Sequence, residues 1–265
     1  MNPKLSIIVP CYNSQETIED TIKSVFALNI SEWELIVVND GSTDGTETIV
    51  QRYKEEDERI NYFYKENGGL GTARNYGIER AHGTYILPLD SDNKIRSHFP
   101  TKALEILEIS NEFDIVYGNA QYFGEKTGIW RMGEFNRFRL LSYNYIDACA
   151  IIRKTVFEDI GLYEVDLPHQ GHEDWELWIR AFNGGKKFYY LDEITFDYRV
   201  SNDSMIKSFN KDMDLENEMY IKNKFSNLYI EHFKPLFWQY EKYKKLANLG
   251  FYDKFKIRLK RLIKN

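Results

Sequence analysis

The chain has 265 residues, a formal net charge of −6 and 43% hydrophobic residues. This length and composition predict a folded protein of one large or two small domains and exclude a disordered chain. No stretch approaches the roughly 18 uninterrupted apolar residues of a membrane-spanning helix, and the N-terminus lacks the pattern of a signal peptide. We therefore expect a cytoplasmic protein.

The first 93 residues alternate short apolar runs with helical patterns. Residues 5–10 predict a buried parallel strand, and the pair Asn13 and Glu16 then has the spacing of a capping box before an amphipathic helix. Strands alternating with helices predict a parallel α/β sheet with right-handed crossovers. The same unit of strand and helix recurs twice: a strand over 35–38 precedes a helix capped by Asp44, and a strand over 62–64 precedes a helix over 72–80. A further strand is expected over 85–89, where Pro88 indicates an edge strand or a bulge.

Beyond residue 93 the pattern predicts a mixed α+β half, and after residue 205 it predicts helices. The expected organisation is therefore residues 1–93, residues 94–205 and a helical C-terminal appendage over 206–265. The elements expected in the second part are helices over 100–109 and 174–182, strands over 114–117 and 146–152, and a helix through Phe157.

The last residues and the two cysteines limit the possible partners. Residues 251–265 hold six basic residues against one acidic residue, a net charge of +5 in a chain that is otherwise acidic. Phe255, Leu259 and Leu262 share one helical stripe there, which fits either reversible attachment to an anionic membrane or a helix packed on the domain. The overall negative charge argues against nucleic-acid binding. Cys11 and Cys149 are too few for a disulfide scaffold, and we expect both to be buried.

Polar residues follow the predicted parallel strands at their carboxyl ends, where open sheets of this kind bind ligands. Asp90 and Asp92 flank the small Ser91 after the fourth strand, so two hard oxygen ligands could hold Mg²⁺ or Mn²⁺, although the same tripeptide also suits a plain turn. Asp40 ends the second strand and could accept hydrogen bonds from a ligand, whereas Asp44 fits a structural cap. Arg74 falls in the first turn of a helix, where a cation opposes the helix dipole, so a ligand-facing role is expected.

These residues belong to motifs that occur in order along the chain. They are Ile8-Val9-Pro10-x-Tyr12-Asn13, Asp40-Gly41-Ser42-Thr43-Asp44, Ala73-Arg74-Asn75-x-Gly77-Ile78, Asp90-Ser91-Asp92 and His172-Glu173-Asp174-Trp175-Glu176-Leu177-Trp178. In order and spacing the chain resembles family 2 glycosyltransferases of the GT-A fold over about residues 4–205. The resemblance implies a metal-dependent, inverting hexosyltransferase that moves a sugar from a nucleotide diphosphate sugar, a UDP-sugar, to a hydroxyl of a glycan or lipid-linked acceptor in cell-surface polysaccharide biosynthesis.

The resemblance also assigns roles to matching residues. Asp174 is the expected catalytic base, Asp92 with Asp90 the metal ligands, and Glu173, Trp175 and His172 the acceptor or sugar contacts. The expected nucleotide-sugar-binding residues are Pro10, Tyr12, Asn13, Asp40, Arg74, Asp90, Ser91, Asp92 and Arg199. One departure is Asn93, where many members carry a further Asp.

Several residues have two interpretations. Arg199 could reach the donor diphosphate from a mobile loop after the last strand, or be an ordinary paired surface group. Trp130, Trp175, Tyr145 and Tyr198 could stack on sugars or belong to the core, and Trp178 is expected in the core. His169 and His172 lack further ligands at metal spacing, which favours a loop contact to substrate.

Two rival functions remain from the sequence. A sugar-nucleotide pyrophosphorylase uses a similar sheet, but its first loop should be glycine-rich and basic, unlike Pro10-Cys11-Tyr12-Asn13. A non-catalytic or degenerate sugar-nucleotide-binding protein should have lost Asp92 or Asp174, and both are present.

Overall fold

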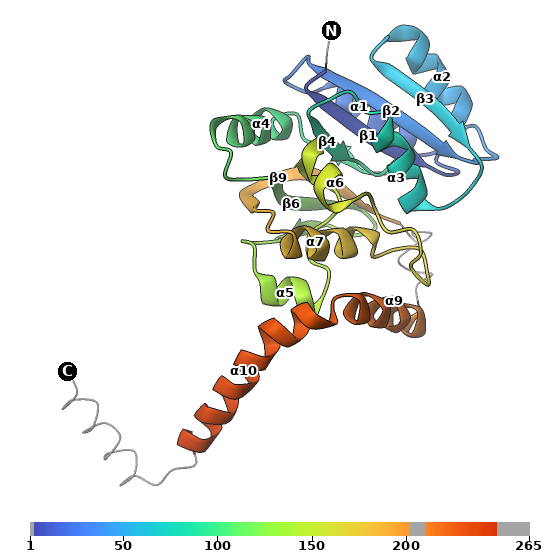
Figure 1. The fold of residues 1–265 in the computed structure, drawn as a ribbon. Coiled ribbons are helices and arrows are strands. Elements are labelled where there is room, and N and C mark those ends of the chain that lie inside the picture. The colour runs from blue at the N-terminus through green and yellow to red at the C-terminus, as the bar shows by residue number, and fades with distance from the viewer. Residues whose placement is uncertain (1–2, 202–209, 248–265) are drawn as a thin grey trace. The chain divides into compact units, whose positions relative to one another are not determined.

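The computed structural model describes residues 3–201 and 210–247. It divides into two compact units, Met1–Tyr220 and Ile221–Asn265. The expected parts 1–93 and 94–205 both fall in the first unit and share one sheet (Figure 1). The basic tail over 251–265 lies outside the described residues, so both interpretations of it stay predictions.

The described residues form one sheet of nine strands. Its order is β3-β2-β1-β4-β8-β6-β9-β5, with β7 paired to β6. The first four strands are parallel, as the sequence predicted: β1 (Leu5–Cys11), β2 (Trp33–Asp40), β3 (Ile60–Lys65) and β4 (Tyr85–Pro88). The other half is mixed. β8 (Ile151–Arg153) is antiparallel to both β4 and β6 (Ile115–Gly124), and β9 (Phe188–Val200) is parallel to β6. Two short strands complete the sheet: β5 (Lys94–Ile95) is antiparallel to β9, and β7 (Gly128–Trp130) is antiparallel to β6.

Helices pack on this sheet, and two more helices follow its last strand in the sequence. α3 packs on β1 and β2, and a Cβ atom at its Gly77 would lie only 2.6 Å from Ile8 Cγ2, so glycine permits the close approach. The described helices are α1 (Ile18–Phe26), α2 (Thr46–Glu56), α3 (Leu70–Glu79), α4 (Phe99–Ile109), α5 (Arg137–Ser142), α6 (Lys154–Ile160), α7 (Glu173–Asn183), α9 (Lys211–Lys224) and α10 (Ser226–Ala247). The appendage after residue 205 is helical where it is described.

The capping box predicted at Asn13 is wrong. α1 begins only at Ile18, and Asn13 has a φ of 49° and accepts a hydrogen bond from Thr43 N at 2.9 Å. The side chain thus joins the loops after β1 and β2. Asp44 has a structural role, because its carboxylate accepts from Thr46 N at 3.0 Å and from Gln15 N at 3.0 Å, but the N-cap of α2 is Gly45, one residue later than expected.

The strand predicted over 146–152 begins only at Ile151. Residues just before it satisfy their N–H groups locally, since Ala150 N donates to Ala148 O at 2.7 Å and Cys149 N donates to Asp147 Oδ1 at 2.9 Å. Backbone groups used in such turns are unavailable to a sheet ladder. Cys149 and Cys11 are buried, as expected.

Pro88 is tolerated in β4 because of its position in the ladder. Leu89 N donates to Ile8 O of β1, so the backbone nitrogen of Pro88 faces the β8 side. The pairing of β4 with β8 ends at Ile86, and no donor is needed there.

Candidate active site

The loops after β1, β2 and β4 meet at one edge of the sheet. Asn13 N donates to Ser42 Oγ at 2.9 Å, and Ser14 Oγ lies 2.8 Å from Ser91 Oγ. These contacts bring together the three strand ends that the sequence marked as polar.

Asp40 is more enclosed than the sequence suggested. Its Oδ1 accepts from Lys65 Nζ at 2.5 Å and from Gly68 N at 3.0 Å, and its Oδ2 accepts from Gly69 N at 2.8 Å. A carboxylate has about four acceptor positions, so three are already used. Asp40 therefore fixes the loop before α3 and keeps one acceptor position, and its expected hydrogen bond to a ligand stays a prediction. The sequence did not reveal the ion pair of Lys65 with Asp40, because the two residues lie on neighbouring strands, β3 and β2.

Tyr12 and Pro10 differ in accessibility. The Tyr12 side chain is 54% exposed beside the strand end, whereas Pro10 is buried in β1 opposite Val38. Tyr12 is thus the residue with a ring available to a ligand, and Pro10 shapes the strand end from within.

Arg74 forms the central bridge of the site. Its Nη1 donates to Glu173 Oε1 at 2.5 Å and its Nη2 donates to Asp90 Oδ1 at 2.6 Å, while its guanidinium lies 5.3 Å from the ring of Tyr163. The residue is only 2% exposed. Both ends of the guanidinium bind carboxylates of the protein itself, and the ligand-facing role expected for Arg74 stays a prediction.

This bridge joins the end of β4 to the start of α7. Asp90 follows β4 and Glu173 is the first residue of α7, so Asp92 and Asp174 are brought to the same region of the sheet edge. Burial raises the pKa of Glu173, and the positive charge of Arg74 opposes that shift. A buried carboxyl is thereby paired rather than left isolated.

Asp90 and Asp92 suit a divalent cation. Burial, and then the negative charge of Asp90, raises the pKa of Asp92 to about 6. A cation bound between these carboxylates would relieve that repulsion. The described residues contain no group of three or more side chains arranged as metal ligands. Water and phosphate oxygens would complete the coordination, as Mg²⁺ and Mn²⁺ prefer with nucleotides.

Asn93 and Arg199 hold the loop that carries Asp92. Asn93 is buried and accepts from Arg199 N at 2.9 Å, so the amide at this position has a structural contact. Arg199 lies inside β9, not in a mobile loop as expected. Its Nε donates to Asp92 O at 3.1 Å and its Nη2 donates to Asp20 Oδ2 at 3.1 Å. The guanidinium is thus a paired group that supports the loop carrying Asp92.

Asp174 is half-buried and held in one orientation. Its two carboxylate oxygens each lie 3.0 Å from Asn144 Nδ2, and Oδ1 also accepts from Trp175 N at 2.8 Å. Sequence reasoning missed Asn144 because it lies in an aromatic-rich loop with no motif. The arrangement leaves a fixed carboxylate with accessible surface.

The three expected acceptor contacts have other surroundings. Glu173 is 5% exposed and paired with Arg74, and Trp175 is 3% exposed with Nε1 donating to Leu140 O at 2.6 Å. Both side chains are buried and already paired, and their expected contacts with acceptor or sugar stay predictions. His172 packs edge-on against Trp175, with ring centroids 5.5 Å apart. Trp178 is buried in the core, as expected.

Asp147 is a carboxylate that the sequence did not reveal. Burial, and then the charge of Asp90, raises its pKa well above the usual range, and Asp174 adds to the shift. Because β8 runs antiparallel to β4, the residues before β8 lie at the carboxyl end of β4. The predicted parallel order gave no reason to examine this position.

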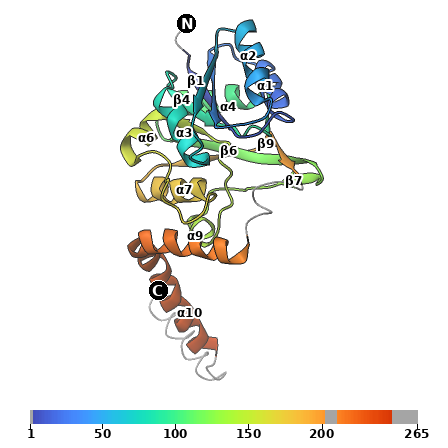
Figure 2. The ribbon, with the colours of Figure 1, turned by 90° about the vertical axis from the view of Figure 1, so that its right-hand side faces the viewer.

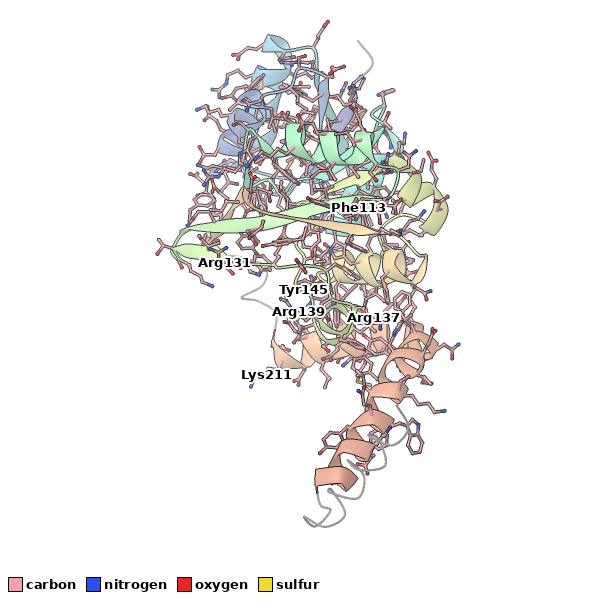
Figure 3. All side chains as sticks on the ribbon, turned by 90° about the vertical axis from the view of Figure 1, so that its left-hand side faces the viewer. Phe113, Arg131, Arg137, Arg139, Tyr145 and Lys211 are labelled. Carbon is pink, nitrogen blue, oxygen red and sulfur yellow. The ribbon has the colours of Figure 1, made fainter. Side chains whose placement is uncertain are left out.

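Strands β6 and β7 pair as an antiparallel hairpin (Figure 2), and several aromatic residues of this region contact one another. Trp130 stacks on Tyr122 with ring centroids 6.1 Å apart and meets Tyr198 edge-on at 5.7 Å. Tyr145 is instead buried, with Arg139 over its ring at 4.1 Å, and the two lie close together in Figure 3. Trp130 and Tyr198 keep their two interpretations, whereas Tyr145 belongs to the core.

The mixed α/β sheet and the carboxylates at its edge define a glycosyltransferase of the GT-A fold. The family model of glycosyl transferase family 2 matches residues 6–161, and the chain belongs to this family.

Related proteins agree with this class. The chain is 31% identical over 253 residues to the putative teichuronic acid biosynthesis glycosyltransferase TuaG of Bacillus subtilis, covering 92% of this chain and 96% of TuaG. It is 30% identical to glycosyltransferase GlyA of Streptococcus pneumoniae over 74% of this chain and 26% of GlyA. S. aureus TarS 1-349 in complex with UDP-GlcNAc superposes with a TM-score of 0.66 at 20% identity, over 86% of this chain and 73% of TarS 1-349. That likeness supports the fold.

None of the helices within residues 3–201 and 210–247 is both long and apolar enough to cross a membrane.

Proposed function

We propose that this glycosyltransferase moves a hexose from a UDP-sugar to a hydroxyl group of a glycan or lipid-linked acceptor, with inversion, in cell-surface polysaccharide biosynthesis. The observation that carries the proposal is the Arg74 bridge, which joins the Asp90–Asp92 loop to the helix that begins with Glu173 and Asp174. The name of TuaG supports the polysaccharide, and the UDP-GlcNAc complex of TarS supports the donor.

The proposed reaction requires a base and a stabilised leaving group. Asp174 accepts the proton of the acceptor hydroxyl as that oxygen attacks the anomeric carbon from the face opposite the diphosphate, and the bond from that carbon to the diphosphate oxygen breaks to release UDP. The amide of Asn144 and the N–H of Trp175 hold its carboxylate in place. Such a positioned base contributes about 10²- to 10⁴-fold in rate.

Asp90 and Asp92 are the residues that would hold Mn²⁺ or Mg²⁺. When bound, the cation neutralises charge that develops on the diphosphate. Arg199 keeps the Asp92 backbone in place through its 3.1 Å hydrogen bond to Asp92 O. A mannosyltransferase of Pyrobaculum calidifontis, solved with GDP-Man and Mn²⁺, superposes with a TM-score of 0.58 at 19% identity over 77% of this chain and 59% of its own.

Tyr12, Asn13 and Asp40 are proposed to surround the uracil. The exposed Tyr12 ring supplies a stacking face, and Asp40 retains one acceptor position for an N–H of the base. Asn13 joins the loop that carries Tyr12 to the loop that follows Asp40, because its side chain accepts a hydrogen bond from Thr43 N.

A donor screen tests the proposed function. UDP-glucose, UDP-galactose, UDP-N-acetylglucosamine and UDP-glucuronate are each incubated with the protein and Mn²⁺, and released UDP is measured beside the thermal shift. We expect one of them to raise the melting temperature and to release UDP. Binding without release of UDP would favour the non-catalytic sugar-nucleotide-binding alternative, and absence of both would contradict the UDP-sugar donor.

Asp92→Asn is expected to weaken metal-dependent UDP binding at least about tenfold, because the amide keeps the shape and loses the charge that holds the cation. Isothermal titration of UDP with Mn²⁺ and with EDTA measures this effect. Asp159→Asn is the control, since that side chain is 57% exposed on α6 and pairs with Lys186. Equal UDP affinity of the unmodified protein in Mn²⁺ and in EDTA would remove the metal from the proposal.

Peripheral membrane contact through residues 251–265 is a further part of the proposal, based on their net charge of +5. Each basic residue near an anionic leaflet contributes about 1 kcal/mol. We expect the chain to sediment with vesicles rich in phosphatidylglycerol and a variant truncated after Gly250 to remain in the supernatant. Equal sedimentation of both would instead support the interpretation in which the tail packs on the domain.

A further inference from the structure

The segment between α6 and α7 leads directly into the proposed base. Its last two residues, Gly171 and His172, have φ values of 106° and 67°. A histidine rarely adopts this left-handed conformation unless its surroundings hold it there. Because Asp174 follows two residues later, the direction of this backbone determines where its carboxylate lies.

Asn217 of α9 contacts that backbone with every polar atom of its side chain. Its Oδ1 accepts from His169 N at 2.9 Å, and its Nδ2 donates to His169 O at 3.0 Å and to Gly171 O at 3.0 Å. The side chain is completely buried, at 0% exposed. A buried amide with all its bonds made to the backbone of one loop fixes that loop in a single conformation.

Two neighbouring residues of α9 reinforce the same contact. His169 Nε2 lies 2.8 Å from Glu216 Oε2, and His172 Nε2 lies 3.4 Å from Asp214 Oδ1. At the other end of the segment, Asn75 of α3 makes an equivalent pair of bonds with the Tyr163 backbone, each 2.8 Å long. The segment is thus held at both ends by a buried or half-buried asparagine.

We propose that Asn217 is a positioning residue for catalysis, which acts by fixing Gly171 and His172 and through them the carboxylate of Asp174. This inference rests on the proposed function, in which Asp174 is the base. Asn217 lies outside residues 6–161, the range matched by the family model. Proton transfer needs hydrogen-bond reach between base and hydroxyl, so a displacement of about 1 Å is enough to lower the rate strongly.

Asn217→Ala tests the proposal against Asn223→Ala, a matched change at an exposed asparagine of the same helix. Both substitutions replace asparagine with the better helix former, so helix propensity cancels in the comparison. Hydrogen–deuterium exchange gives a readout that needs no substrate. We expect the amides over residues 169–175 to exchange at least about tenfold faster in Asn217→Ala alone, because the His169 amide loses its partner.

Kinetics with the donor selected by the screen give the second readout. We expect kcat of Asn217→Ala to fall about tenfold or more with the donor KM and the Kd of UDP unchanged, since the Asp40 and Asp92 loops are untouched. In the Asp174→Asn background the same substitution should lower kcat no further. Should Asn217→Ala fail to fold, Asn217→Leu serves in its place, because leucine fills the buried volume and likewise removes the acceptor of the His169 N–H.

The outcomes separate the two hypotheses. Unchanged exchange over 169–175, or a kcat equal to that of Asn223→Ala, would overturn the positioning role. So would independent, multiplicative losses in the double variant. If Asp174→Asn itself remains active, the proposed base is wrong, whatever the exchange measurement shows.

Discussion

Asp174→Asn is expected to lower turnover by at least about 10²-fold, with the melting temperature and UDP affinity near those of the unmodified protein. An asparagine keeps the shape of the side chain and can still accept from Asn144 and Trp175, but it cannot take the proton of an acceptor hydroxyl. Release of UDP from the donor selected by the screen measures turnover. Calorimetry with UDP and Mn²⁺ checks that the donor side is intact.

Glu173→Gln is the matched control, because it removes the neighbouring carboxylate at the same helix start. We expect it to reduce turnover less than Asp174→Asn does and to reduce stability more, since Arg74 then loses one of its two charged partners. Near-normal turnover of Asp174→Asn would assign the base to another carboxylate. Glu173, next to Asp174 in the chain, and Asp147, which lies near Asp90 and Asp174, would then be examined by the same substitutions.

Arg74→Met is expected to lower the free energy of unfolding by about 3–5 kcal/mol. The substitution removes the cation that pairs the buried carboxylate of Glu173, and an unpaired charge at that depth is costly. Urea unfolding followed by circular dichroism measures the loss, and the slope of the transition checks that the folded state is comparable.

Two controls make the Arg74 prediction specific. Arg59→Met removes a partly exposed guanidinium that pairs with Asp57, and we expect a loss of less than about 1 kcal/mol. Adding Glu173→Gln to Arg74→Met should restore part of the stability, because the orphaned charge is removed as well. A loss no greater than that of Arg59→Met, with no recovery in the double variant, would show that the bridge contributes little.

The parallel half of the sheet could be predicted because it is encoded locally. Continuous apolar runs followed by helical periodicity specify β1 to β4, and ligands bind where such strands end. Asp90 and Asp92 could be picked out from their position after the fourth strand, whereas Asp174 was implied by the resemblance to family 2 glycosyltransferases. What the sequence did not reveal was which of the polar side chains already bind each other.

The parts of the site that could not be predicted from the sequence depend on contacts between distant segments of the chain. Arg74 pairs with a residue 99 positions away, and no periodicity in either segment indicates the pair. Asp147 and Asn144 reach the site because β8 runs antiparallel to β4, which a three-residue strand with no alternation does not show. The capping box at Asn13 failed for a related reason: the side chain binds the loop after β2 instead of the helix that follows it.

The long range of the Arg74 bridge also bears on when the site forms. Arg74 meets Asp90 after 16 residues but meets Glu173 only after 99. A chain emerging from the ribosome can therefore build β1 to β4 and the carboxylate loop well before α7 exists. Contacts of such high sequence separation form late, because closing the intervening loop costs entropy before it brings any contact. We therefore expect the contact of Arg74 with Asp90 to form before its contact with Glu173, so that the proposed base is the last part of the site to be placed.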